Sequence, residues 1–380
     1  MEVGTTPIMA PVPIDPVPAR RLTVAMVAPP WYPLPPHGYG GIELVVSLLA
    51  RGLRERGHRV LLLGAEDSRD AVIGLAPQAW RPDLGNVHSQ GLRDVTYAAR
   101  VHRYLLENST VDLVHDHSGL SVVAGAQALE LAPVVHTVHG PVTEALATAI
   151  QSLGTGTSLV AISQAQLQPA PWLPWVGVVP NAVDVEALNV LPREDKEPYL
   201  LVLARICPDK GQHHAIEVAA RAGMRLVLAG KVDPGSEDYF AEEIEPHLDG
   251  KWVTWHHNVS GADKARLLTR ATALLAPITW PEPFGLSMVE AMVSGTPTIA
   301  FRQGAAPELI DDGRTGFVVD TLDEMVAAVA AAGDIDPARC SLLARNRFSP
   351  DVMVDDYLKV YERVLERARD AQPRAGYVSA

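Results

Sequence analysis

The 380-residue sequence is poor in cysteine, in positive charge and in long apolar runs. Two cysteines, Cys207 and Cys340, stand far apart in the chain, and one such pair cannot build a disulfide framework or a thiolate metal site. Lysine and arginine number 32 against 45 aspartates and glutamates, so the formal net charge is −13. A nucleic-acid binder needs basic surface to offset phosphate charge, and this balance therefore argues against nucleic acid as a partner.

No uncharged apolar run reaches the roughly 18 residues that predict a membrane-spanning helix. The first 20 residues repeat proline and lack the positively charged start of a signal peptide, so we expect a flexible proline-rich arm at 1–20. A peripheral association with a membrane stays open, although no strongly basic amphipathic helix supports it. We expect a soluble, reduced, cytoplasmic protein, either a monomer or a homodimer.

What the sequence does contain is enough apolar material for folded cores. Hydrophobic residues make up 47% of the chain and charged residues 20%, a balance that excludes a wholly disordered protein. Domains commonly have about 100–200 residues, so this length suggests two or three of them.

Short apolar runs alternate with helical patterns along almost the whole chain. The first run, 22–28, is followed by prolines and glycines and then by an amphipathic segment, 42–56, that predicts a helix. Repeated strand-then-helix units are typical of a parallel sheet with helices on both faces. The expected strands are 22–28, 59–63, 112–115, 133–138, 158–162 and 176–179, then 199–205, 225–229, 252–255, 274–276, 298–301 and 317–319.

A polar, turn-rich segment, 180–198, divides this pattern into two halves. We therefore predict an α/β fold of two Rossmann-like, doubly wound parallel-sheet domains that face each other across a cleft, where ligands bind at the carboxyl ends of the strands. An amphipathic helix at 351–369 ends the pattern. The predicted parts are the arm at 1–20, an N-terminal domain at 21–182, a C-terminal domain at 183–355, and a helix at about 356–370 that crosses back to the first domain.

The strongest chemical motif is PEPFGLSMVE at 281–290. Glu282 precedes the start of a predicted helix and Glu290 lies about one and a half turns inside it. A carboxylate on either side of a bound diphosphate could accept hydrogen bonds from a sugar hydroxyl and a ribose hydroxyl; the alternative is a capped helix with two solvated glutamates. Between them, backbone N–H groups at the helix start would form an anion site, at Gly285, Leu286 and Ser287.

Two further motifs follow the first strand of each half. Arg205 and Lys210 stand at a strand end before a helix, where a guanidinium and an ammonium suit a diphosphate. Gly40 and Gly41 follow the first strand and let a backbone approach a ligand closely at a helix N-terminus. Each would be an ordinary surface or turn feature on its own.

A histidine follows the strand 133–138 at a position that points toward the cleft. We assign this place to His139 and expect His136 to lie within the strand. The segment His115-Asp116-His117 also ends a strand, but consecutive strand residues face opposite ways, so we favour an acceptor-side role for Asp116 over a metal cluster.

With the Gly-Thr-Pro at 295–297, the motif at 281–290 resembles the donor site of the retaining glycosyltransferases of family 4, which have the GT-B fold. The resemblance covers nearly the whole chain from residue 21 to about 365. It implies that Arg205 and Lys210 neutralise the donor diphosphate, that Glu282 contacts the donor sugar and Glu290 the ribose, and that His139 lies near the reacting carbon.

The resemblance also suggests weaker assignments. The loop with Gly40 and Gly41 would meet the donor phosphate, and Gly230 would let the backbone pass close to the nucleotide. Trp31 and Tyr32 lie in a stiff proline-rich loop that either stacks on the acceptor or packs on its own domain. Further family-like positions are Ser163, which precedes a predicted helix, and Ala182, which replaces a usual glycine and would be strained if its φ were positive.

The implied reaction moves a sugar from a nucleotide diphosphate sugar to a hydroxyl with retention. We expect a UDP-sugar, glucose-like, with GDP-mannose second, and a small-molecule, lipid-linked or saccharide acceptor. We expect no cofactor beyond this co-substrate and no metal, since the Asp-x-Asp at 334–336 lies outside the predicted cleft. The alternatives are a nucleotide-sugar 2-epimerase and a sugar-nucleotide-binding protein without turnover.

Overall fold

The computed structural model describes residues 20–38, 40–81, 87–108, 110–154 and 156–371. The predicted arm therefore lies outside the described residues except for Arg20. None of the helices in these ranges combines the length and the apolar composition needed to cross a membrane.

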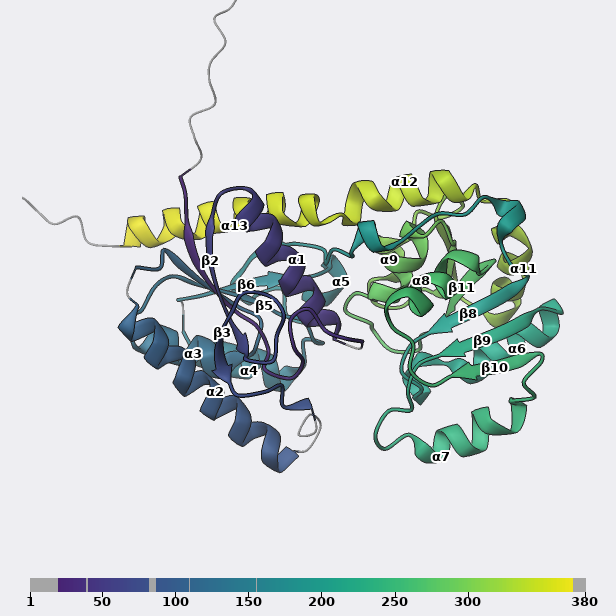
Figure 1. Cartoon of the computed structure of the whole chain (residues 1–380), viewed down its shortest axis with the longest axis horizontal. Coiled ribbons are helices and arrows are strands. Elements are labelled where there is room, and N and C mark those ends of the chain that lie inside the picture. Colours follow the sequence, from purple (N-terminus) through teal and green to yellow (C-terminus); the bar gives the residue numbers. More distant parts are fainter. Residues whose placement is uncertain (1–19, 39, 82–86, 109, 155, 372–380) are drawn as a thin grey trace, which may run out of the picture.

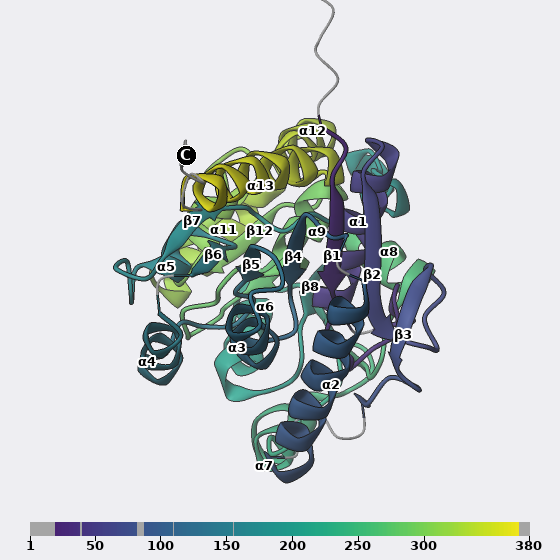
Figure 2. The same ribbon diagram turned by 90° about the vertical axis from the view of Figure 1, so that its left-hand side faces the viewer.

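The first half of the chain forms a seven-stranded sheet in the order β3-β2-β1-β4-β5-β6-β7 with every pairing parallel. Strands and helices alternate along the chain, and Figure 2 shows helices on both sides of this sheet. The strands are β1 (Thr23–Val27), β2 (Arg59–Ala65), β3 (Val72–Ala76), β4 (Leu113–Asp116), β5 (Val134–Thr137), β6 (Thr157–Ala161) and β7 (Trp175–Val178). The helices are α1 (Gly41–Glu55), α2 (Val87–Glu107), α3 (Leu120–Ala128), α4 (Glu144–Ser152) and α5 (Gln164–Leu167).

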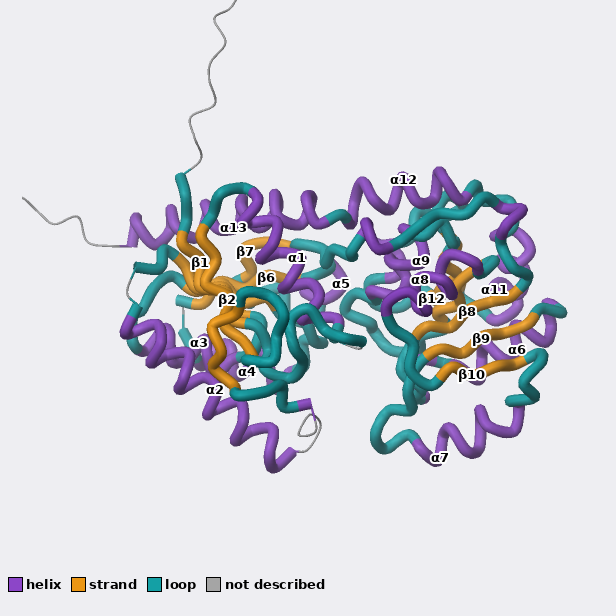
Figure 3. Tube along the Cα trace, in the orientation of Figure 1, coloured by secondary structure: helices purple, strands orange, loops and turns teal. Residues whose placement is uncertain are grey.

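The second half repeats the arrangement with six parallel strands in the order β10-β9-β8-β11-β12-β13. In Figure 3 the strands of this sheet run side by side in orange, with loops at their ends. The strands are β8 (Tyr199–Leu203), β9 (Arg225–Ala229), β10 (Val253–His256), β11 (Ala273–Ala276), β12 (Thr298–Phe301) and β13 (Gly316–Val319). The α-helices are α6 (Gln212–Ala222), α7 (Glu237–Tyr239), α8 (Gly261–Arg270), α9 (Leu286–Val293), α10 (Ala306–Leu309), α11 (Leu322–Ala332), α12 (Pro337–Phe348) and α13 (Pro350–Ala371).

Both sheets have the strand order of a doubly wound fold, so the prediction of two Rossmann-like parallel sheets is confirmed. The order reverses between β1 and β4 in the first sheet and between β8 and β11 in the second. Loops that leave neighbouring strands at such a reversal diverge to opposite faces and leave room for a ligand at the carboxyl edge. One strand, β3, was not predicted.

The last helix joins the two halves. Figure 1 shows α12 and α13 in yellow along one side of the molecule, from the second sheet to the first. α13 packs on α1 and β7, where a Cβ added at Gly52 would lie 2.6 Å from a methyl of Val354. Tyr357 and Tyr361 are fully buried there, among residues of the first sheet. The helix that begins next to the second domain thus completes the core of the first.

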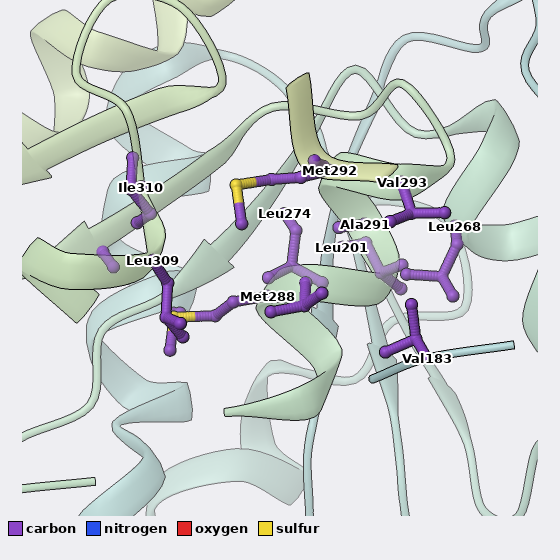
Figure 4. Packing of buried hydrophobic residues seen from close by; sticks show 14 of the residues in the cluster. Val183, Leu201, Leu268, Leu274, Met288, Ala291, Met292, Val293, Leu309 and Ile310 are labelled. Carbon is purple, nitrogen blue, oxygen red and sulfur yellow. The ribbon is translucent and has the colours of Figure 1, made fainter. Parts of the chain in front are cut away.

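The core of the second domain holds α9 in place. Met288, Ala291 and Met292 recur at helical spacing on one side of α9 and are buried. Figure 4 shows these side chains close to Leu274 and Leu309 of neighbouring elements. Because residues 288–293 of this helix are all buried, its first turn has a fixed position at the carboxyl edge of the sheet.

Candidate active site

The carboxyl edges of the two sheets meet each other. A Cβ added at Gly41, at the start of α1, would lie 2.8 Å from Cδ1 of Leu286, at the start of α9. The carboxylate of Glu308 accepts the backbone N–H groups of Gln164 (2.7 Å) and Ala165 (2.5 Å) from the other domain. Segments that follow strands at both switch points therefore face a common interdomain region. The predicted residues Gly40, Arg205 and Glu282 lie on such segments, whereas His139 follows β5 and Gly230 follows β9.

The start of α9 presents its first backbone N–H groups at this region. Gly285 precedes the helix with φ of 100°, a conformation that suits glycine, and a Cβ there would lie 2.2 Å from Cε of Met288. The N–H groups at the first positions of a helix have no acceptor within it, and they carry the positive end of the helix dipole. Gly285, Leu286 and Ser287 thus stand where the sequence placed an anion site.

The two glutamates of the motif each pair with a lysine. Glu282 contacts the Lys210 ammonium through Oε2. Glu290 contacts the Lys264 ammonium at 2.6 Å, with only 10% of the Glu290 side chain exposed. The Glu282–Lys210 pair joins two residues that the sequence analysis had assigned separately, whereas Lys264 had not been predicted.

Arg205 follows β8 and pairs with Asp233, which follows β9. Lys210 ends a short turn before α6, with its ammonium 5.2 Å from the centre of the Trp280 ring. A Cβ at Gly230 would lie 1.9 Å from the carbonyl oxygen of Ala204, so this glycine is required by the neighbouring backbone. Any approach to a nucleotide would be additional to that requirement.

The histidines form a buried group at the ends of β4 and β5. His139 follows β5 and contacts His117 through Nε2, at 2.9 Å from Nδ1 of that ring. His136 lies within β5, as predicted, and is hydrogen-bonded through Nδ1 to Asp116 at 2.7 Å. Burial lowers the pKa of His139 to about 3, so its ring is neutral at physiological pH.

Asp116 is buried and its carboxylate is fully engaged. Oδ1 accepts the backbone N–H and the hydroxyl of Ser118, and Oδ2 accepts the backbone N–H of Gly119 besides contacting His136. These bonds fix the loop between β4 and α3. The carboxylate is not exposed and positions this loop, and the acceptor-side role of Asp116 stays a prediction.

The loop before Gly40 packs against its own domain. Trp31 and Tyr32 are buried, and the Trp31 ring meets Trp80 edge-on at 6.5 Å between centres. This is the second of the two alternatives that the sequence left open for these aromatic residues. Glu43, in the first turn of α1, contacts the backbone of the same loop at Tyr32. Burial raises the pKa of Glu43 to about 7, although hydrogen bonds from its own backbone and from that of Tyr32 act to lower it.

The weaker family-like positions are structurally ordinary. Ser163 caps α5, where its hydroxyl accepts the N–H of Gln166. Among the described residues Glu130 is the non-glycine residue with a positive φ, so Ala182 does not carry the strain that its replacement of glycine raised.

Two hollows lie away from this region, at the amino edge of the second sheet. One, of about 190 Å³, is lined by residues that include Arg225 and Lys251, and the other, of about 160 Å³, by residues that include Lys196 and Pro297. Neither contains a predicted site residue, and the topological argument places the ligand at the opposite edge.

Sequence reasoning missed Lys264, Asp233, Glu308 and His117. Lys264 and Asp233 had no local pattern to mark them, because each pairs with a residue from another element. His117 was visible as part of His115-Asp116-His117, and its place just after a strand could have linked it to His139, because the two residues follow the neighbouring parallel strands β4 and β5.

Comparison with known proteins agrees with this geometry. The family described as "Glycosyltransferase Family 4" matches residues 39–187, and the family described as "Glycosyl transferases group 1" matches residues 186–337. The phosphatidyl-myo-inositol mannosyltransferase of Mycolicibacterium smegmatis is 25% identical over 90% of this chain and 94% of that protein. The glycogen synthase of Mycobacterium tuberculosis is also 25% identical, over 90% of this chain and 95% of that protein.

A solved structure gives the same result. The crystal structure of AviGT4, a glycosyltransferase involved in avilamycin A biosynthesis, is similar with a TM-score of 0.67 and 27% identity, over 91% of this chain and 98% of that one. The two matched families together cover residues 39–337, which contain every strand of the two sheets except β1, and the fold and the motif at 281–290 agree with them. The chain belongs to the family 4 glycosyltransferases of the GT-B fold.

Proposed function

We propose that this glycosyltransferase moves a sugar, with retention at the anomeric carbon, from a nucleotide diphosphate sugar to a hydroxyl acceptor. A glucose-like UDP-sugar is the favoured donor and GDP-mannose the second. The acceptor is a small molecule, a saccharide or a lipid-linked sugar. The cytoplasmic location and the homodimer stay predictions of the sequence.

The observation that carries this proposal is the pair of Lys–Glu contacts on either side of the α9 N-terminus. The diphosphate would accept hydrogen bonds from the first N–H groups of α9 and draw the lysine ammoniums toward it. Glu282 and Glu290 would then exchange their lysine contacts for sugar and ribose hydroxyls. Arg205, at the end of β8, would add a third positive group.

The chemical step needs a stabilised leaving group more than a protein nucleophile. The bond between the anomeric carbon and the diphosphate oxygen breaks, and a bond from that carbon to the acceptor oxygen forms on the same face. The acceptor proton passes to the departing phosphate oxygen, whose growing negative charge is met by Arg205, Lys210 and the α9 N-terminus. His139, neutral at working pH, would contact the sugar near the reacting carbon.

We propose that no metal takes part. Among the described residues, no group of three or more His, Cys, Asp or Glu side chains is arranged to hold a metal ion. Asp336, of the late Asp-x-Asp segment, caps α12 by accepting the N–H of Ala338. Full turnover in excess chelator supports this part of the proposal, and a loss that added metal restores would refute it.

The relatives do not agree on the sugar that is transferred. One is named for transfer of mannose to phosphatidyl-myo-inositol and another for synthesis of glycogen, so their names favour two different sugars. A thermal-shift panel of UDP-glucose, GDP-mannose and other nucleotide sugars separates them, because a ligand that binds the native state raises the melting temperature. A shift with the GDP-sugar alone would replace our first choice.

The decisive experiment follows nucleotide release and product mass with the donor identified in this way. Transfer of the sugar raises the mass of the acceptor by one sugar residue. In the slow hydrolysis of the donor, water is the acceptor and the product is the free sugar. Epimerisation would leave the donor mass unchanged, and a binding protein would release no nucleotide. Either of those results would refute the proposed function.

A further inference from the structure

His117 makes a contact that neither the motifs nor the proposed chemistry uses. It follows β4 directly, and His139 lies two residues after the end of β5, the neighbouring parallel strand. Nδ1 of His117 lies 2.9 Å from Nε2 of His139, and the two rings are stacked with 5.2 Å between their centres. His117 is buried, and its polar contact with the His139 side chain helps to fix the orientation of the His139 ring.

The contact needs one proton between the two nitrogens. Burial, and the neighbouring histidines after it, hold the pKa of His117 well below its usual range, and burial lowers the pKa of His139 to about 3. Both rings are therefore neutral, and each carries a proton on one nitrogen only. One ring must donate and the other accept.

The surroundings of His117 decide which ring donates. Nε2 of His117 is buried and has no hydrogen-bond partner among the described residues. Buried N–H groups without an acceptor are rarer in proteins than buried acceptors without a donor. The proton of His117 therefore belongs on Nδ1, where it is donated to Nε2 of His139. His139 must then carry its own proton on Nδ1.

A second layer of hydrogen-bonded side chains lies behind His117. His115 lies against the His117 ring, at 4.0 Å between centres, and both of its nitrogens are bonded: to the hydroxyl of Tyr361 at 2.7 Å and to that of Thr137 at 2.8 Å. Thr137 also contacts the hydroxyl of Tyr357 at 2.9 Å. The two tyrosines come from α13, so this helix supports the histidines from behind.

We propose that His117 is a positioning residue that fixes the tautomer of His139, so that Nδ1–H of His139 is the group available to the donor sugar. Nδ1 of His139 has no partner within the described parts of the chain, which leaves it free to donate to a sugar oxygen. This inference rests on the proposed function for the identity of the ligand. The tautomer itself is a property of the free protein.

Nitrogen NMR of the free, full-length protein labelled with ¹⁵N-histidine tests the tautomer directly, since protonated and bare ring nitrogens resonate well apart. The signals of His139 are assigned by their absence in His139→Gln. We expect His139 to be protonated at Nδ1 in the wild type and in His117→Asn, whose amide can donate from the place of Nδ1. In His117→Phe this preference should be lost.

Thr137→Val is the matched control. It removes the buried contacts of Thr137 with His115 and Tyr357 but leaves the pair His117–His139 intact, so a general loosening of the site would appear in it as well. We expect the His139 tautomer to be unchanged in this variant. A wild-type His139 protonated at Nε2, or a spectrum that His117→Phe leaves unaltered, overturns the proposal.

Release of UDP from UDP-glucose supplies a second readout. His117→Phe should lower kcat by about tenfold, the effect of losing one well-placed hydrogen bond, and His117→Asn should restore most of it. Equal kcat values for His117→Phe and the wild type would overturn the role toward the donor sugar. If the wild type turns over no nucleotide sugar at all, the proposed function fails, and the NMR result alone decides the positioning of His139.

Discussion

Replacing Lys210 should destabilise the protein as well as weaken donor binding, because Lys210 is held by Glu282. The two side chains are only 11% and 15% exposed. In Lys210→Met the Glu282 carboxylate would remain at the domain interface without its counter-ion. We therefore expect a loss of stability that is separate from any loss of turnover, and the two can be measured apart.

The size of the effect follows from burial. Removing one partner of a buried ion pair costs about 3–5 kcal/mol, whereas an exposed pair contributes about 0–1 kcal/mol. This pair lies near the buried limit, so we expect a loss of about 3 kcal/mol from Lys210→Met and a similar loss from Glu282→Gln. For a domain of this size that corresponds to a fall in Tm of about 6–12 °C.

Urea unfolding of the two single variants and of the double variant measures the coupling. The double variant has no uncompensated charge. Its loss of stability should therefore be about 2 kcal/mol smaller than the sum of the losses in the two single variants. UDP at 100 times its Kd should add about 2.7 kcal/mol to the wild type and much less to Lys210→Met. Single losses below about 1 kcal/mol that simply add in the double variant would refute the view that the pair acts as a buried unit.

Three other expectations follow from the same contacts. Burial raises the pKa of Glu43 to about 7, so between pH 4.5 and 7 the folded protein binds a proton that the unfolded chain has lost. The free energy of unfolding should therefore fall as the pH rises from about 4.5 to 7 and level off above. In urea unfolding at pH 8, Glu43→Gln should be more stable than the wild type by up to about 3 kcal/mol, and an unchanged pH profile would contradict this. Glu308→Ala should speed hydrogen exchange at the amides of residues 164 and 165, whereas Glu324→Ala, which removes the acceptor of the Asp320 N–H, should not. Gly230→Ala should destabilise the protein well beyond Gly223→Ala, which has a positive φ but open space around it and should cost about 1–2 kcal/mol; equal losses would show that the close approach to Ala204 does not matter.

The residues that the sequence could place are those whose position depends on a single strand end. Arg205 directly follows a short apolar run and Gly285 directly precedes a packed helix, so their relation to the sheet edge can be read locally. The two positions follow β8 and β11, which are neighbouring parallel strands of the second sheet, so they come to the same edge of that sheet. The parallel-sheet fold and the position of the α9 N-terminus at the sheet edge were predictable for this reason, whereas the anion site there stays a prediction.

Other features depend on contacts between distant segments and have no local pattern. Lys264 lies on α8 and meets Glu290 on α9, and nothing near either residue in the sequence marks the pair. Trp31 is buried because Trp80 packs against it, which its own proline-rich loop does not indicate. The edge strand β3 has the apolar sequence VIGLA, but it is short and contains a glycine, and its place at the edge of the sheet depends on its pairing with β2.

The pairing of the cations gives the net charge of −13 a specific consequence for the proposed donor. Arg205, Lys210 and Lys264 each already contact a carboxylate, namely Asp233, Glu282 and Glu290. A bare pyrophosphate that drew the two lysines away would leave Glu282 and Glu290 with neither a counter-ion nor a hydroxyl donor, at the cost that buried unpaired charges carry. A nucleotide sugar brings hydroxyl groups that can replace the lysines at those carboxylates. If the donor binds as proposed, the acidic partners would favour the complete donor over its diphosphate alone, and selectivity would come from the exchange of contacts rather than from a surplus of positive charge.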